Sequence, residues 1–330
     1  MSLLLLSALL SACGGGKQTP EPQGDLSPAA SGEKQQTEQQ GSNSPTQGNK
    51  LLPEYQGDTP EPFKEKIPET APPFPMEHIK NKIGGMQAVH VSTAEEFVQA
   101  IDSDTCILLA PGNYDLTEWV TQTYDGTLPD HVEMDWDFSL CVKDVHDLWI
   151  VAEKPEEQTA IVVTNAYIPV LRFMDCISIR LYGLTLGHDV EPGSCTGSVL
   201  QLDECTDTNL EWLDLYGCGT YGLESYGGNE FRMRYSKVHD CSVGGLYMVL
   251  CDDAMFYGCT FERCGEDTVL DSSGSILHFR RCTFRENTGP LFPQPGDYDH
   301  DSSFIFEEAE FGDAESKQLD NALVIVREAC

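Results

Sequence analysis

Apolar positions recur along the second half of the chain at a fixed step of 23 residues. Two apolar columns show this step: Leu215, Val238, Phe261 and Phe284, and Leu210, Met233, Phe256 and Phe279. Cysteine, glycine and asparagine fill two further columns: Cys218, Cys241, Cys264 and Asn287, and Cys205, Gly228, Cys251 and Gly274. A fixed period in the twenties predicts a solenoid, in which each turn is covered only by its neighbours.

The length of the step selects the kind of solenoid. Repeats made of helix pairs need more than about 30 residues, and the spaced leucines of leucine-rich repeats are missing. The segments 254–264 and 277–287 are short, rich in aromatic and β-favouring residues, and separated by polar or glycine corners. We therefore predict an all-β parallel β-helix, whose coils stack about 4.8 Å apart.

The segment 89–114 predicts the start of this solenoid. Ser92 and Glu95 have the spacing of a capping box at the beginning of a helix. The expected helix presents an apolar face made of Ala94, Phe97, Val98 and Ile101. We expect this helix to cap the first coil.

With these features the chain resembles the right-handed parallel β-helix, or pectate-lyase-like, superfamily over residues 86–315. The resemblance rests on the entry segment 89–114 and on coils such as Gly245–Cys264. It implies one right-handed, single-stranded β-helix domain over residues 77–330, with its ligand along one sheet between loops. Members of this superfamily include lyases, hydrolases, epimerases, tailspikes and adhesins, so the fold does not fix the function.

The first 76 residues differ in character from the rest. An apolar run at Leu3–Leu10 is too short to span a bilayer and is typical of a signal peptide over residues 1–13. The run Leu10-Ser11-Ala12-Cys13 resembles the lipobox of bacterial lipoproteins, which implies that Cys13 carries a lipid anchor in the cell membrane. The alternative is an ordinary secretory signal that contains a cysteine. Residues 14–76 are rich in Pro, Gln, Gly and Ser, as in a disordered tether.

Acidic residues dominate the composition. The chain has 20 Lys and Arg against 54 Asp and Glu, a formal net charge of −34. Such a surface repels nucleic acid and also disfavours polyanionic substrates. The alternative is that the acidity only keeps an exported protein soluble.

Twelve cysteines remain besides Cys13. Neighbouring coils would place stacked cysteines within disulfide distance, but a column of three cannot pair completely. No spacing typical of zinc ligands occurs. We predict stacked free thiols that pack as small buried apolar groups.

The column register also predicts an outward row of candidate ligand-binding residues. Leu200, Leu223, Leu246 and Val269 are expected to point inward. The candidates on the outward side of this sheet are Arg172, Gln201, Asp203, Glu224, Tyr226 and Tyr247. The same register extends the outward rows through Val249, Leu270 and Ser272, and gives Asp271 an inward position that only local bending would expose.

Carboxylate, amide and tyrosine side chains along a groove suit sugar rings, because aromatic faces stack and carboxylates accept hydroxyl groups. The insertions 117–138 and 188–197 have the length to wall such a groove, and the first carries Trp119 and Trp136. The alternatives are a solvated sheet face without a ligand, and an insertion that folds down on the core.

A catalytic set is not evident. Within the superfamily, polygalacturonase-like members use clustered aspartates and a Gly-His-Gly segment, and lyase-like members use a calcium site with a basic residue. This chain offers Glu266, Asp267 and Asp271 without a Gly-His-Gly segment. Its loose counterpart of the lyase set is Arg172, Asp175 and Asp203.

Three alternating acids, Asp297, Asp299 and Asp301, resemble the start of a calcium loop, although the glycine and distal glutamate of an EF-hand are missing. The alternative is an acidic surface loop. No other cofactor is expected.

Three functions stay open at this point. The first is a surface lipoprotein, expected to be a monomer, that recognises extracellular polysaccharide. The second is a non-catalytic adhesin or spacer with a protein partner. The third is a polysaccharide lyase or glycoside hydrolase.

Overall fold

The computed structural model describes residues 74, 76–135, 137–191, 193–217, 219–293, 302–320 and 324–327. The chain divides into two compact units, Met1–Lys64 and Glu65–Cys330, and every described residue belongs to the second. No helix among these residues is long and apolar enough to cross a membrane.

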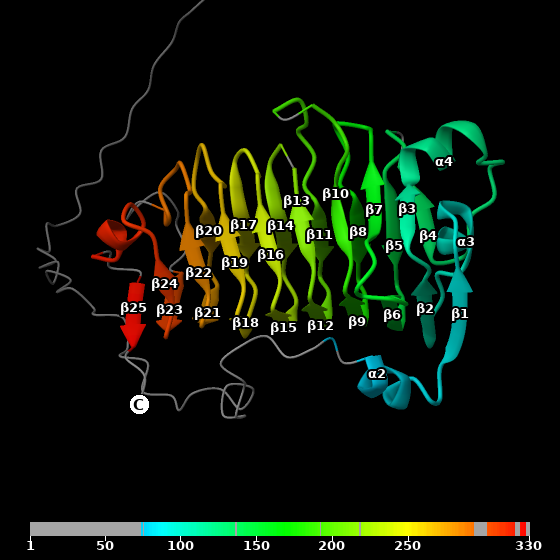
Figure 1. Cartoon of the computed structure of the whole chain (residues 1–330), viewed down its shortest axis with the longest axis horizontal. Coiled ribbons are helices and arrows are strands. Elements are labelled where there is room, and N and C mark those ends of the chain that lie inside the picture. The colour runs from blue at the N-terminus through cyan, green and yellow to red at the C-terminus, as the bar shows by residue number, and fades with distance from the viewer. Residues whose placement is uncertain are drawn as a thin grey trace, which may run out of the picture. The chain divides into compact units, whose positions relative to one another are not determined.

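Three sheets of stacked strands build the second unit (Figure 1). Sheet A contains β1 (Gln87–Val91), β2 (Thr105–Leu109), β6 (His146–Ala152), β9 (Ile177–Tyr182), β12 (Thr206–Glu211), β15 (Asn229–Arg234), β18 (Ala254–Tyr257), β21 (Ile276–Arg280), β23 (Ser303–Glu307) and β25 (Val324–Arg327). Sheet B contains β3 (Gly112–Asp115), β7 (Thr159–Val163), β10 (Thr185–His188), β13 (Asp214–Tyr216), β16 (Lys237–His239), β19 (Thr260–Glu262), β22 (Thr283–Arg285) and β24 (Glu310–Phe311). Sheet C contains β4 (Val132–Met134), β5 (Leu140–Lys143), β8 (Leu171–Met174), β11 (Leu200–Asp203), β14 (Tyr221–Tyr226), β17 (Gly244–Val249) and β20 (Leu270–Ser273).

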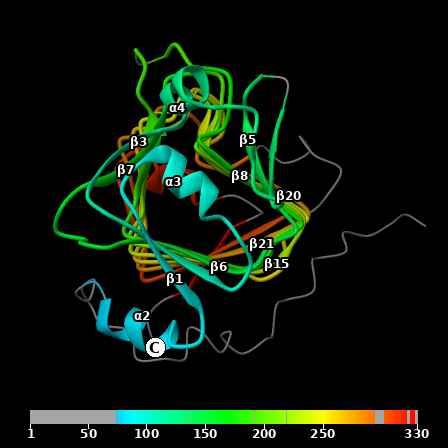
Figure 2. The ribbon, with the colours of Figure 1, turned by 90° about the vertical axis from the view of Figure 1, so that its right-hand side faces the viewer.

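From β8 to β22 each coil contributes one strand to sheet C, then one to sheet A and one to sheet B, as in β11, β12 and β13. The described strands pair in parallel, except that β4 runs antiparallel to β5. Seen along the stacking direction, the three sheets enclose one interior (Figure 2). The parallel β-helix predicted from the repeat is therefore the architecture of this unit.

The predicted apolar columns form the core. Leu210, Met233, Phe256 and Phe279 are register partners in sheet A, and Leu215, Val238, Phe261 and Phe284 are partners in sheet B. Phe256 stacks on Phe279 with ring centroids 4.6 Å apart, and Phe279 stacks on Phe306 at 5.1 Å. Each coil thus buries one aromatic or aliphatic side chain directly above the next.

Many corners between the sheets are single residues in the left-handed backbone region. Glu204 and Leu250 take this conformation between sheets C and A, with φ of 52° and 53°, and at the equivalent corner between them two successive glycines do so, Gly227 and Gly228, with φ of 70° and 86°. A turn through one left-handed residue keeps the corner short, so successive coils stay in register. The occurrence of non-glycine residues at such corners explains why glycine alone does not mark them in the sequence.

Helix α3 (Ala94–Gln99) lies across the end of the coils in Figure 2, as predicted, and buries Phe97 and Val98. The predicted capping box is wrong by one residue. Thr93 is the N-cap and accepts a hydrogen bond from the backbone N–H of Glu96, whose carboxylate accepts from the N–H and hydroxyl of Ser92. The helix starts one residue later than expected, so Glu96 takes the role assigned to Glu95.

Three further helical turns surround the coils: α2 (Met76–Lys82), α4 (Leu116–Gln122) and the 3-10 turn η1 (Ser316–Gln318). Helix α2 covers part of the outer face of sheet A, where Ile79 and Ile83 pack with Trp149 and Tyr182. The segment 318–330 is expected to cover the last coil. Its described strand β25 adds to the edge of sheet A beside β23, and Leu319 and Val324 of this segment pack against the core.

The outward register predicted for the last strand of sheet C is wrong. Leu270 pairs with Leu246 and is fully buried, whereas Asp271 pairs with Tyr247 and Ser273 with Val249. The step is therefore 24 residues in sheet C at this coil, while sheet A keeps 23 between Ala254 and Leu277. One extra residue before β20 is compensated by a shorter corner after it, so no column of the other sheets reveals the change.

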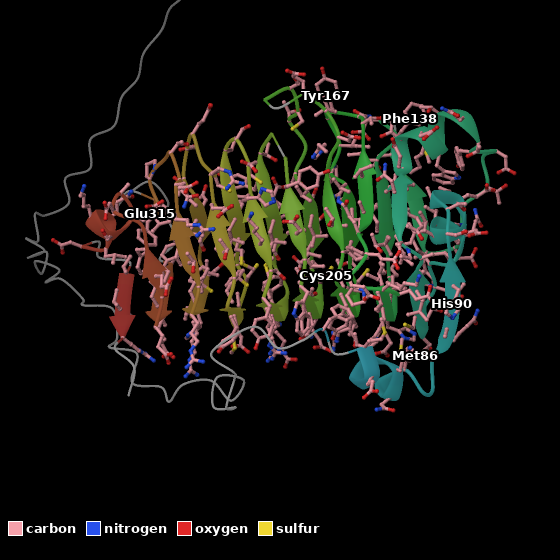
Figure 3. The ribbon with its side chains drawn as sticks, viewed as in Figure 1. Met86, His90, Phe138, Tyr167, Cys205 and Glu315 are labelled. Atoms are coloured by element: carbon pink, nitrogen blue, oxygen red, sulfur yellow. The ribbon has the colours of Figure 1, made fainter. Side chains whose placement is uncertain are left out.

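The cysteines described in the structure are free and buried: Cys106, Cys141, Cys176, Cys195, Cys205, Cys241, Cys251, Cys259, Cys264 and Cys282. Cys205, for example, lies within the stack of coils (Figure 3). In the neighbouring column, the amide oxygen of Asn287 accepts from the backbone N–H of Cys264 at 3.0 Å. The expectation of buried free thiols holds for these residues.

Candidate functional site

The six predicted ligand-binding residues share the outer face of sheet C. Arg172 lies on β8, Gln201 and Asp203 on β11, Glu224 and Tyr226 on β14, and Tyr247 on β17. One outward row consists of Cys141, Arg172, Gln201, Glu224, Tyr247 and Asp271, and the other of Lys143, Met174, Asp203, Tyr226, Val249 and Ser273. We call these two rows the sheet C face.

A polar cluster occupies the β8–β11 part of the face. The guanidinium of Arg172 donates to the carboxylate of Asp203 from Nε at 2.9 Å and lies 2.8 Å from it through Nη2. A second carboxylate, that of Asp135, lies 3.4 Å from Nη1. The amide of Gln201 donates to Asp203 at 3.2 Å. These contacts fix three of the predicted residues relative to one another.

A cluster of three tyrosines occupies the β14–β17 part. The ring of Tyr247 stacks on that of Tyr221, with centroids 5.2 Å apart, and meets the edge of Tyr226 at 5.5 Å. Tyr221 was missed in the sequence. Its place depends on Gly244, since a Cβ there would lie 2.6 Å from the Tyr221 ring. Because β14 and β17 hold all three rings, the cluster is formed before any ligand binds.

Two carboxyl groups flank the tyrosines. Burial raises the pKa of Glu224, against the hydrogen bonds that Thr220, Ser198 and Tyr226 offer to its charged form. The hydroxyl of Tyr221 donates to the carboxylate of Asp271 at 3.0 Å. The inward position predicted for Asp271 is wrong, because the 24-residue step turns its side chain to the outer row. In the sequence, this outward position could be inferred only from the one extra residue in the loop before β20.

The insertion 117–138 reaches the face through its last residues. Its strand β4 pairs with β5 and carries Glu133, whose carboxylate binds Lys143 Nζ at 3.0 Å. Trp119, by contrast, is buried on α4 and packs against Tyr124, so this part of the insertion folds down on the core. Trp136 lies outside the described residues.

Two exposed aromatic side chains stand on loops along the same side of the stack of coils, the upper side in Figure 3. Phe138 follows β4 and is 55% exposed, and Tyr167 follows β7 and is 73% exposed. The loops are joined by a hydrogen bond from the amide of Asn165 to the carbonyl of Asp137 at 3.1 Å. They were not among the predicted site residues.

A separate cavity of about 430 Å³ lies at the corner between sheets B and C, beside the second insertion. Its lining includes Tyr216, Asp240 and Arg263. Arg263 binds both oxygens of Asp240, at 2.7 and 2.8 Å, and its hydrogen bonds hold the pKa of that carboxyl near 2. Arg263 and Asp240 of this wall are thus paired with each other, and Glu266, one of the acids considered for catalysis in the sequence, also lines the cavity.

The metal-binding and lipidation predictions fall outside the described residues, because Asp297, Asp299, Asp301 and Cys13 all lie there. Within the described part of the chain, one group of acids and histidine comes close enough to hold an ion: Asp104, His146 and Asp147. All three are exposed and lie at the start of sheet A rather than on the sheet C face. Of the loose lyase-like set, Arg172 and Asp203 form an ion pair. The second carboxylate that Arg172 contacts is that of Asp135 in the insertion, not that of Asp175.

Comparisons with known proteins agree with this architecture. Residues 190–311 match the family described as the right handed beta helix region, and together with the sheet topology this confirms the predicted right-handed parallel β-helix. The crystal structure of the pectate lyase Pel9A superposes with a TM-score of 0.37 and 10% identity, over 74% of this chain and 80% of that chain.

Two other solved structures are similar at the same level. ORF18 of Geobacillus virus E2 has a TM-score of 0.31 and 14% identity, over 72% of this chain and 60% of that chain. The periplasmic alginate epimerase AlgG has a TM-score of 0.31 and 11% identity, with coverage of 74% and 73%. No curated protein matches the sequence. Identities this low assign no activity to the chain.

Proposed function

Because the chain carries a right-handed parallel β-helix domain, we propose that it is an extracytoplasmic lipoprotein whose sheet C face binds extracellular polysaccharide. In this proposal Cys13 holds the lipid anchor, residues 14–76 form the tether, and the β-helix is presented to the outside. The observation that carries the proposal is the tyrosine cluster on β14 and β17, next to a polar cluster on β8 and β11.

This arrangement matches the chemistry of sugar chains. A sugar ring offers an apolar face of C–H groups and a rim of hydroxyl groups. The half-exposed rings of Tyr226 and Tyr247 suit the first, and the amide and carboxyl groups of Gln201, Asp203 and Glu224 suit the second. Neighbouring strands lie about 4.8 Å apart, so a chain that crosses the strands meets a new pair of side chains in each coil.

Glycoside hydrolysis is the second candidate, and the pKa of Glu224 favours it. A carboxyl group whose pKa is raised by burial can donate a proton to a leaving oxygen, while an ionised neighbour acts on the other side of the bond. Asp203, held by Arg172, and Asp271 are the neighbouring carboxyl groups. Release of reducing sugar from a bound polysaccharide, lost in Glu224→Gln, would distinguish hydrolysis from recognition.

The binding proposal is tested with the full chain in affinity electrophoresis against a panel of soluble polysaccharides. Tyr247→Ala should weaken binding by more than about tenfold, because a central aromatic residue in an interface contributes about 2 kcal/mol or more. Tyr235→Ala is the matched control, since Tyr235 stands at the corner of sheets A and B and packs against Trp212 and Tyr257. It should leave binding unchanged.

The proposed site would be contradicted if the wild type binds a polysaccharide and the variants at Tyr247, Tyr226 and Glu224 bind it with the same affinity. A wild-type protein that binds no member of the panel would favour the non-catalytic adhesin or spacer.

A further inference from the structure

The charges on the sheet C face select the class of sugar chain. We propose, as an extension of the proposed function, that this face takes chains of neutral or amino sugars and excludes uronate and sulfated polymers. The inference rests on which ionic groups stand on the face and on how they are already paired.

Carboxyl groups outnumber cations on the face and its adjoining hairpin. The two rows contain the cations Lys143 and Arg172. The carboxyl groups on the rows and on the hairpin that contacts them are Glu133, Asp135, Asp203, Glu224 and Asp271. Even without Glu224 and the buried Asp271, an anionic polymer laid across these strands would meet the carboxylates of Glu133, Asp135 and Asp203 against only two cations.

Both cations are also occupied. Arg172 binds Asp203 through two nitrogens, at 2.9 and 2.8 Å, and reaches Asp135 at 3.4 Å. Its side chain is only 24% exposed, and that of Asp203 only 15%, so water and salt screen this pair less than an open surface pair. Lys143 is held by Glu133 at 3.0 Å. To bind a uronate, the face would have to break one of these pairs and leave its carboxylate uncompensated.

A neutral sugar chain meets no such obstacle. Its hydroxyl groups can donate to the carboxylates, and its ring faces can lie on Tyr226 and Tyr247 without any ion pair being opened. The carboxyl group of Glu224 can accept hydrogen bonds from sugar hydroxyl groups. An amino sugar adds a positive charge, which the excess of carboxyl groups favours. The acidic surface of the whole chain repels polyanions at longer range in addition.

The test compares neutral, amino-sugar and uronate polysaccharides by affinity electrophoresis at low and high salt, each with calcium and with chelator. The full-length wild type should bind a neutral or amino-sugar chain through Tyr247 and should not bind polygalacturonate or alginate. Asp203→Asn removes the main partner of Arg172 and should raise the affinity for uronate chains by about tenfold at low salt, with less gain at high salt.

Asp207→Asn is the matched control. It removes the same charge and also takes the carboxylate partner from an arginine, because Asp207 binds Arg180 at 2.5 Å. That pair lies on sheet A, between β9 and β12, so its loss should not create uronate binding through the sheet C face.

The outcomes separate this inference from the function on which it rests. Tyr247-dependent binding of a uronate chain by the wild type, with or without calcium, overturns the selectivity and leaves polysaccharide binding intact. Failure of Asp203→Asn to gain uronate affinity beyond Asp207→Asn overturns the role of the Arg172 pair. Absence of binding to every sugar class overturns the proposed function and the selectivity together.

Discussion

The ring of Tyr247 is held by two other tyrosines before any ligand arrives. Tyr221 stacks on one side and Tyr226 meets it edge-on. A ligand that binds such a ring does not have to fix its rotamer, which reduces the entropy lost on binding. The same holds for Asp203, because Arg172 and Gln201 both donate to its carboxylate. Individual residues of the face are thus oriented by their neighbours in adjacent coils.

Outside the face, His239 on sheet B forms a pH-sensitive contact. Its Nε2 lies 2.9 Å from the carboxylate of Asp214, and Nδ1 contacts Asp240. Burial and the nearby Lys237 lower the pKa of His239, but the hydrogen bonds and charges of the two aspartates outweigh them and raise it above the ordinary 6.5. Tyr216 stacks on the ring at 6.0 Å, and Arg263 also faces it while binding Asp240.

The sign of the pH dependence follows from this raised pKa. The protonated ring stabilises the fold fully below pH 6.5, and the contribution is lost as the pH rises through the higher pKa of the folded state. We expect the free energy of unfolding of the wild type to fall, relative to that of His239→Gln, as the pH rises above 6.5. Denaturant titrations of both proteins across this range measure it. Parallel pH profiles would contradict the ion-pair account.

At the scale of elements, the columns carry the fold. Phe256 lies between Met233 and Phe279 in sheet A, and its side chain is fully buried. Phe256→Ala should lower the free energy of unfolding by about 3–5 kcal/mol, because a large cavity opens inside a stacked core. Tyr247→Ala, on the outer face, should cost much less. A loss below about 1 kcal/mol for Phe256→Ala in a cooperative unfolding assay would contradict the stacking register.

The columns were predictable because residues separated by one coil occupy equivalent positions in successive coils and their side chains point in the same direction. From Leu210 to Phe279 every step is 23 residues, and every partner in sheet A was assigned correctly. The same rule placed all six candidate residues on one face of sheet C. The rule failed at Asp271, because one extra residue in the preceding loop shifts the register of β20 by one residue and exchanges its inward and outward side chains. A compensating deletion hides that change from the columns of sheets A and B. The predicted corner column of Cys205, Gly228, Cys251 and Gly274 is wrong at its last member, because Gly274 takes the left-handed corner position of Leu250.

Other parts of the site have no periodic signal. Tyr221 joins the cluster only because a glycine on the next strand leaves room for its ring. Glu133 and Asp135 reach the face through an antiparallel hairpin that occurs outside the repeat. The helix boundary at Thr93 differed by one residue from the predicted cap, since Ser92, Thr93, Glu95 and Glu96 offer two equivalent capping patterns. Side-chain contacts between coils of different length can be assigned only from the three-dimensional structure, because the periodic pattern does not give their register.

At the scale of the whole molecule, the proposal joins an anchor, a tether and a rigid binding domain. A lipid on Cys13 would hold the chain at the membrane, and the tether would let the sheet C face search for its ligand within reach of the surface. Cys13→Ala should therefore release the protein from the membrane fraction into the soluble extracytoplasmic fraction. Cys205→Ala, a substitution in the buried core, is the control that should keep the protein in the membrane fraction. Continued membrane association of Cys13→Ala would refute the anchor.

The crystal structure of the protein in complex with an oligosaccharide from the polysaccharide that it binds most tightly tests the central claim most directly. Our account predicts a sugar ring against Tyr247 and Tyr226, with the chain continuing across β11 toward Arg172 and its ion pairs intact. A sugar bound in the 430 Å³ cavity beside Tyr216 and Arg263, with the sheet C face empty, would contradict it.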